Sequence, residues 1–177
     1  MSDTPRIAAL IYDESQDPDA LLRGFAADLN GRGMRAVGLV QLGDPLADPP
    51  QLSALLLHSN ETMRLFQDLG RGSTGCKLDV GQLLAAGTLV AKAIDDGADL
   101  VIINRFGRQE IEGKGLSYLI ERALSAEIPV VIAVPDARLA AWKMFSDGMA
   151  VQLTCDRPAL DGWWSTVAAD AEPALSA

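Results

Sequence analysis

The sequence predicts a three-layer α/β fold, in which helices cover both faces of a mainly parallel sheet. Short apolar segments rich in β-branched residues alternate with amphipathic segments along most of the 177 residues. Two of the apolar segments, 100–103 and 129–134, contain no polar or charged side chain. Such uninterrupted runs are typical of parallel strands that are covered on both faces.

The first third of the chain predicts two strands, a helix and a hairpin. A strand is expected at 6–12, and a helix follows because Asp17 can cap its N-terminus and Pro18 suits its first turn. The Asn30-Gly31 pair ends this helix. A second strand is expected at 36–41. The segments 52–58 and 62–69 then predict an antiparallel hairpin at one edge of the sheet, around the turn 59–61.

The remaining elements alternate more regularly. A glycine-rich loop is expected at 70–78, and a helix at 79–96 follows it, with an apolar face made by Val80, Leu83, Leu84, Gly87, Ala91 and Ile94. The later elements are a strand at 99–104, a helix at 115–126, a strand at 129–134, a helix at 138–145, a strand at 150–153 and a helix at 158–168. No repeat or linker divides the chain, so residues 1–177 are predicted to form one domain with a frayed tail at 170–177.

Composition excludes several classes of protein. Hydrophobic residues make up 49% of the chain, which predicts a globular protein, and no apolar run has the length of a membrane span. The N-terminus lacks a secretory pattern, and the two cysteines do not form a disulfide framework, so we expect a cytoplasmic protein with reduced thiols. The net charge of −9 opposes binding to nucleic acid. Trp142, Trp163 and Trp164 fit either the core or a contact in a homo-oligomer.

A basic segment directly follows the buried strand at 99–104. Asn104, Arg105 and Arg108 are expected at the carboxyl end of this strand, where open α/β sheets bind ligands. Two guanidinium groups at that edge indicate an anion site. The alternative is that both arginines are solvated, or are paired with Glu110 and Glu112.

The glycine-rich loop is a second candidate for anion binding. It nearly matches the phosphate-binding pattern G-x-x-x-x-G-K-[ST], but Cys76 is inserted before Lys77, and Leu78 stands where a hydroxyl group would hold magnesium. Its glycines and hydroxyl groups, just before a helix, still suit an anion; a loop without function is the alternative. The candidate ligand-binding residues of the two segments are Arg71, Ser73, Thr74, Gly75, Cys76, Lys77, Asn104, Arg105, Arg108 and Lys114.

The cysteines and the histidine are weaker candidates. The cations around Cys76 favour a thiolate that could act as a nucleophile or a soft metal ligand, although a packed thiol is the simpler interpretation. No partner base is evident, since His58 is the only histidine and suits an ordinary strand position. Cys155 is predicted to lie in the core.

The loop after the first strand is unlike a phosphate-binding loop. Residues 12–19 carry four carboxylates and neither glycine nor lysine, so they would repel a triphosphate. They suit the N-terminus of a helix, or else a bound cation. A P-loop hydrolase also needs an acid for magnesium at the end of a neighbouring strand, and Asn104 stands at that place.

Three motifs together resemble a known family. Residues 75–79 (GCKLD), 103–110 (INRFGRQE) and 113–115 (GKG) are similar to those of DUF2478, an uncharacterised bacterial family, and the similarity extends from Ile7 to about Leu153. Members are similar to P-loop nucleoside-triphosphatases, which implies a P-loop-like fold whose catalytic positions are degenerate here. Their genes often lie near those of molybdate transport or molybdenum enzymes, which implies molybdate or tungstate as a ligand.

Three functions follow as hypotheses. The first is a cytoplasmic protein that binds an oxyanion, or a phosphate-bearing ligand, and takes part in molybdenum handling. The second is a nucleoside-triphosphate phosphohydrolase in which Glu110 orients water and Asp13 or Asp79 holds a metal. The third is an interaction protein whose basic segment contacts an acidic partner.

Overall fold

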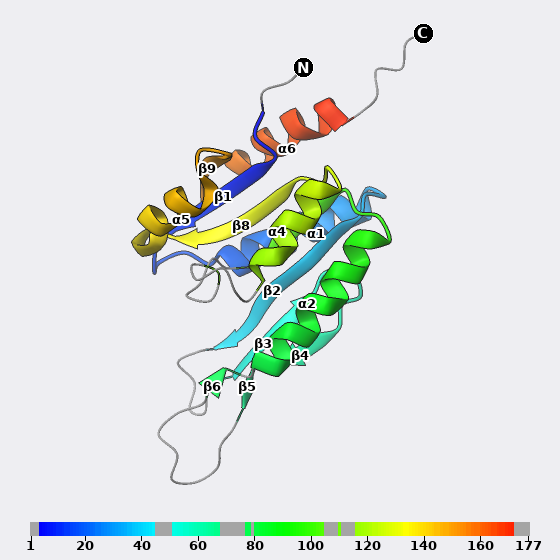
Figure 1. Cartoon of the computed structure of the whole chain (residues 1–177), viewed down its shortest axis with the longest axis vertical. Helices are drawn as coiled ribbons and strands as arrows, with labels where there is room; N and C mark the ends of the chain where they lie inside the picture. Colours follow the sequence, from blue (N-terminus) through cyan, green and yellow to red (C-terminus); the bar gives the residue numbers. More distant parts are fainter. Residues whose placement is uncertain are drawn as a thin grey trace.

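A computed structural model of the chain describes residues 4–44, 51–67, 77–78, 80–104, 110 and 116–171. Its main feature is a sheet of seven strands in the order β4-β3-β2-β7-β8-β1-β9 (Figure 1). The strands of this sheet are β1 (Ile7–Tyr12), β2 (Ala36–Asp44), β3 (Gln51–Leu56), β4 (Thr62–Arg64), β7 (Leu100–Ile103), β8 (Val130–Pro135) and β9 (Ala150–Thr154). From β2 to β9 all neighbouring strands are parallel, whereas β2–β3 and β3–β4 are antiparallel. The predicted three-layer, mainly parallel fold with an antiparallel edge hairpin is confirmed.

Helices cover both faces of the sheet. One face packs against α2 (Val80–Asp95), α4 (Ser117–Ser125) and α5 (Leu139–Ser146), and the opposite face packs against α1 (Pro18–Gly31) and α6 (Arg157–Ala171). Figure 1 shows α2, α4 and α5 in front of the strands and α1 behind them. A short 3-10 helix, η1 (Asp136–Arg138), leads into α5.

The central strands are buried because apolar side chains project from both faces of the sheet into the two cores. In β1, Ile7 and Ala9 face the core under α2, α4 and α5, while Ala8 and Leu10 face the core over α1 and α6. All four residues of β7 are buried as well. The three tryptophans that fitted either a core or a subunit contact are buried in these two cores, Trp142 in the first and Trp163 and Trp164 in the second.

Several element boundaries differ from those predicted. The strand predicted at 62–69 stops at Arg64, and β5 (Phe66–Gln67) instead pairs with β6 (Lys77–Leu78) in a separate two-stranded sheet. Lys77 and Leu78 therefore belong to a strand and not to the predicted loop. Once the chain leaves the edge of the main sheet, its backbone groups need new partners, and β6 supplies them. At the other end, α6 continues through Ala171 into the predicted tail.

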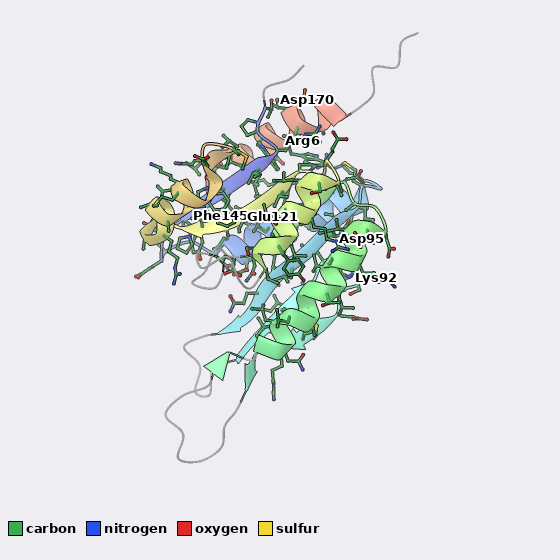
Figure 2. The ribbon with its side chains drawn as sticks, in the orientation of Figure 1. Arg6, Lys92, Asp95, Glu121, Phe145 and Asp170 are labelled. Carbon is green, nitrogen blue, oxygen red and sulfur yellow. The ribbon has the colours of Figure 1, made fainter. Side chains whose placement is uncertain are left out.

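The apolar face predicted for α2 is wrong at Leu84. Leu84 is exposed, whereas Leu83, Val90 and Ile94 are buried against the sheet. The helix also packs against α4, and the exposed Arg122–Asp95 ion pair joins the two. Figure 2 labels Asp95 near the C-terminal end of α2.

Gly38 lets β2 and β7 approach closely. It stands opposite Ile102 in the parallel register and has a φ of +134°, which side chains other than glycine rarely adopt. A Cβ atom at this position would lie 1.9 Å from the carbonyl oxygen of Ile102.

Within the described residues, no helix is long and apolar enough to cross a membrane.

Candidate functional site

The carboxyl edge of the parallel strands is the candidate site. The connection from β1 runs through α1 on one face towards β2, whereas the connection from β8 runs through α5 on the other face to β9. Neighbouring strands whose connections leave in opposite directions form the crevice in which α/β proteins bind ligands. The point where the connections diverge lies between the ends of β1 and β8, and Asn104 follows the next strand, β7.

The loop between β1 and α1 is closed by its own hydrogen bonds. Oδ1 of Asp13 accepts from the backbone N–H and the hydroxyl group of Ser15, and these bonds hold the pKa of Asp13 below its usual value. The Asp13 N–H in turn donates to Oε1 of Gln16, at 3.0 Å. Asp17 caps α1 by accepting from the N–H of Ala20 at 3.0 Å, as predicted. Carboxylates thus occupy the place where a phosphate-binding loop would offer free N–H groups.

A further carboxylate fixes the start of α1 against the sheet. Asp19 is buried, and its Oδ1 accepts from the N–H of Gln41 in β2, at 2.8 Å. Three of the four acids predicted in this loop, the aspartates, therefore have different tasks. Asp17 and Asp19 hold the helix, and Asp13 holds the turn.

Asn104 and Glu110 are the described residues of the basic segment, and both are buried. Asn104 follows β7 and is 8% exposed, while Glu110 is 6% exposed. Oε1 of Glu110 accepts from the N–H of Leu116 at 3.1 Å, just before α4 begins. This bond gives Glu110 a structural task that the sequence did not indicate: it ties the segment that follows β7 to the N-terminal end of α4.

Most of the other predicted ligand-binding residues lie outside the described part of the chain. These are Arg71, Ser73, Thr74, Gly75, Cys76, Arg105, Arg108 and Lys114. Of Lys77, the structure gives the backbone, which pairs with Gln67 in the small sheet. The anion-binding roles predicted for these residues therefore stay predictions.

An open pocket of about 380 Å³ lies at the carboxyl end of the β1–β9 pair. Its walls are Ile11, Gln16, Gln152, Leu153, Thr154 and Cys155. Cys155, predicted to be a core residue, is half-buried and lines this pocket instead, because β9 is the edge strand and leaves one side of its carboxyl end uncovered. Burial, together with the charges of Asp156, Asp17 and Asp13, raises the pKa of the Cys155 thiol. The polar Gln152 and Thr154, which alternate with apolar residues, are the sequence signal that could have indicated the pocket.

His58, predicted at an ordinary strand position, lies instead in the turn after β3, at the opposite end of the sheet from the carboxyl edge. Its Nδ1 is buried without a hydrogen-bond partner. Burial and the nearby Arg35 lower the pKa of His58, and Glu61 partly opposes this shift. These surroundings favour the neutral imidazole.

Within the described residues, no three histidine, cysteine or acidic side chains are arranged to hold a metal ion. Asp79, a predicted metal ligand of the phosphohydrolase alternative, lies outside the described residues.

Comparison with known proteins identifies the family. The model of a protein family of unknown function, DUF2478, matches residues 7–163. The chain belongs to the DUF2478 family. The predicted resemblance is therefore confirmed, and it covers most of the chain.

A curated relative of this DUF2478 protein is much longer. The chain is 38% identical over 164 residues to a protein of Bradyrhizobium diazoefficiens named molybdenum import ATP-binding protein ModC 2. The matched region is 92% of this chain but 18% of the relative. The DUF2478 chain thus corresponds to less than a fifth of that relative.

A solved structure supports the fold. THEP1 from the hyperthermophile Aquifex aeolicus superposes with a TM-score of 0.65, covering 94% of this chain and 99% of THEP1. The two sequences are 12% identical, so the likeness concerns the fold alone. It agrees with the three-layer α/β fold that the sequence predicts.

Proposed function

We propose that this DUF2478 protein binds a small oxyanion, of the molybdate or tungstate type, or a phosphate-bearing group, and takes part in molybdenum handling in the cytoplasm. The observation that carries the proposal is the 38% identity to a molybdenum import protein over 92% of this chain. Molybdate is a dianion, and a protein with a net charge of −9 needs a local concentration of donors and cations to bind it.

The proposed site lies beside the carboxyl end of β7. The amide of the buried Asn104 can donate a hydrogen bond there without adding negative charge. Arg105 and Arg108 follow in sequence and would supply charge-assisted, bidentate contacts. The remaining proposed contacts come from the glycine-rich segment and from Lys114, and they are Arg71, Ser73, Thr74, Gly75, Cys76 and Lys77.

The geometry on the β1 side supports this placement. The carboxylates of Asp13 and Asp17 lie in the loop between β1 and α1. An anion near the end of β1 would therefore be repelled by two negative charges. Two strands further along the sheet, at β7, the described residue at the strand end is a neutral amide. The charge distribution therefore favours an anion on the β7 side of the edge.

Binding is favoured over hydrolysis by the position of Glu110. The carboxylate that could orient water is buried and accepts the N–H of Leu116, which is a structural use of that group. One specific observation favours the phosphohydrolase alternative: the name of the relative contains the words "ATP-binding". It predicts magnesium-dependent phosphate release that is lost in Glu110→Gln, a change that keeps an oxygen for Leu116.

Ligand binding tests the proposal directly. Calorimetry with molybdate, tungstate, sulfate, phosphate and Mg-ATP is expected to show saturable binding of molybdate or tungstate. One charge-assisted hydrogen bond contributes about 1.5–3 kcal/mol, so Arg105→Ala or Arg108→Ala should weaken binding about tenfold or more. Arg23→Ala removes an exposed guanidinium from α1 and serves as the matched control.

Asn104→Asp provides a second test at the described residue. It keeps the size of the side chain and adds a negative charge beside the proposed anion, so binding should be lost while the far-ultraviolet circular dichroism stays that of the parent. Parent-like affinity in the Asn104 variant and in both arginine variants would contradict the proposed site. Binding of Mg-ATP alone would favour the phosphohydrolase.

A further inference from the structure

The pocket between β1 and β9 is separate from the proposed anion site. It lies at the same edge of the sheet, but β1 and β8 stand between it and β7. Its volume of about 380 Å³ is within the range of small-molecule sites. Ile11 and Leu153 give it an apolar wall, and Gln152 and Thr154 add polar groups.

Three carboxylates lie near this pocket. Asp13, Asp17 and Asp156 all act electrostatically on Cys155, which lines it. Each carboxylate accepts hydrogen bonds from neutral donors: Asp13 from Ser15, Asp17 from the Ala20 N–H, and Asp156 from the Thr154 hydroxyl and the Ala159 N–H.

The helix ends do not cancel these charges. The N-termini of α1 and α6 meet the loops that carry Asp17 and Asp156, and each contributes about half a positive charge. The negative charge of the three carboxylates therefore exceeds the total of about one positive charge at the two helix ends. Arg157, next to Asp156, is already balanced by its ion pairs with Asp28 and Asp161. The pocket is consequently electronegative and disfavours anions.

We propose that this pocket binds an organic cation, a guanidinium or primary ammonium group on a short hydrocarbon stem. The stem would pack on Ile11 and Leu153, as the stems of lysine and arginine do on apolar surfaces. Oε1 of Gln152 and the free lone pair of the Thr154 hydroxyl group would accept hydrogen bonds from the charged head. Asp13, Asp17 and Asp156 would balance its charge. The proposal does not depend on oxyanion binding at β7.

The NMR chemical shifts of the Gln16 and Gln152 side-chain amides measure binding at the pocket, because both residues line it. The full chain, labelled with ¹⁵N, is titrated with butylguanidinium and with its neutral isostere butylurea. A tripeptide, N-acetyl-Ala-Arg-Ala-amide, is the third probe, because the same chemistry could come from a free cation or from an arginine of a protein. Saturable shifts of both amides with butylguanidinium or with the peptide are expected, and butylurea should cause none. A peptide affinity at least tenfold higher than that of butylguanidinium would identify a protein side chain as the source, and a smaller ratio would identify a free cation.

Isosteric variants test the electrostatic basis. Asp156→Asn and Asp17→Asn keep a capping side chain but remove one negative charge each. Each should weaken binding about fivefold, the value for loss of one exposed charge contact at about 4 Å. Asp96→Asn, at the other end of the sheet, removes the same charge and should leave the affinity unchanged. Equal shifts with butylurea, no saturation by either cation up to about 10 mM, or equal affinity in all variants would overturn the proposal.

Discussion

Replacement of Gly38 by alanine is expected to destabilise the protein more than any other single methyl addition at its described glycines. The new Cβ would lie 1.9 Å from the Ile102 carbonyl oxygen and 2.8 Å from the Ile102 backbone nitrogen, which are both main-chain atoms in the neighbouring strand. Neither can turn away as a side chain could, so β2 and β7 would have to separate. The φ of +134° adds strain of about 1–3 kcal/mol for a residue with a Cβ.

The magnitude follows from these two contributions. Separation of the strands would weaken one or two of their hydrogen bonds, at about 1 kcal/mol each, in addition to the strain. The free energy of unfolding should therefore fall by about 2–5 kcal/mol. For a chain of this size, such a loss corresponds to a melting temperature lowered by about 4–20 °C.

Chemical and thermal denaturation measure this effect, and Gly24→Ala is the matched control. Gly24 lies in α1 with open space around its Cβ position, so alanine should stabilise the protein by about 0.5–1 kcal/mol. The same substitution is thus expected to act with opposite sign at two positions. An unchanged melting temperature in Gly38→Ala would refute the inferred close approach of the two strands.

Three further predictions concern single contacts. Because the folded state lowers the pKa of His58, the parent should lose stability as pH falls through the unfolded value of about 6.5. In His58→Gln, the denaturation midpoint should depend less on pH between about 7.5 and about 5.5, and a pH profile identical to that of the parent would contradict this. Glu110→Ala removes the acceptor of the buried Leu116 N–H and should cost about 1–3 kcal/mol in urea denaturation, whereas Glu110→Gln should cost less; equal losses would count against the hydrogen bond. Asp17→Ala removes the cap of α1 and should lower stability by about 1 kcal/mol, while Asp17→Asn should retain it; a parent-like alanine variant would argue against capping.

The fold was largely predictable because its signals are local. The β-branched runs at β7 and β8 indicated strands covered on both faces, and Asp17 with Pro18 indicated the first turn of α1. Strand limits were less predictable, as in β4, which stops at Arg64 where the chain leaves the sheet. Whether residues 1–177 form one domain stays a prediction.

The position of Asn104 was predictable, but the task of Glu110 was not. Sequence placed Asn104 at the end of a buried strand, and the structure confirms this place. It did not indicate that Glu110 accepts from Leu116, because a bond between a side chain and an N–H six residues further along the chain follows no regular helix or strand spacing. The contributions of Arg105 and Arg108 stay predictions, since both lie outside the described residues.

The sequence by itself determined the fold class, the family and the acidic character of the first loop, because each depends on residue type and short-range spacing. Only the tertiary structure decided which strands are neighbours. That arrangement places Cys155 in an open pocket beside β1, packs Gly38 against Ile102, and leaves His58 at the opposite edge. These contacts join residues far apart in the chain. They depend on the order of strands in the sheet, which alternating strand and helix signals do not specify.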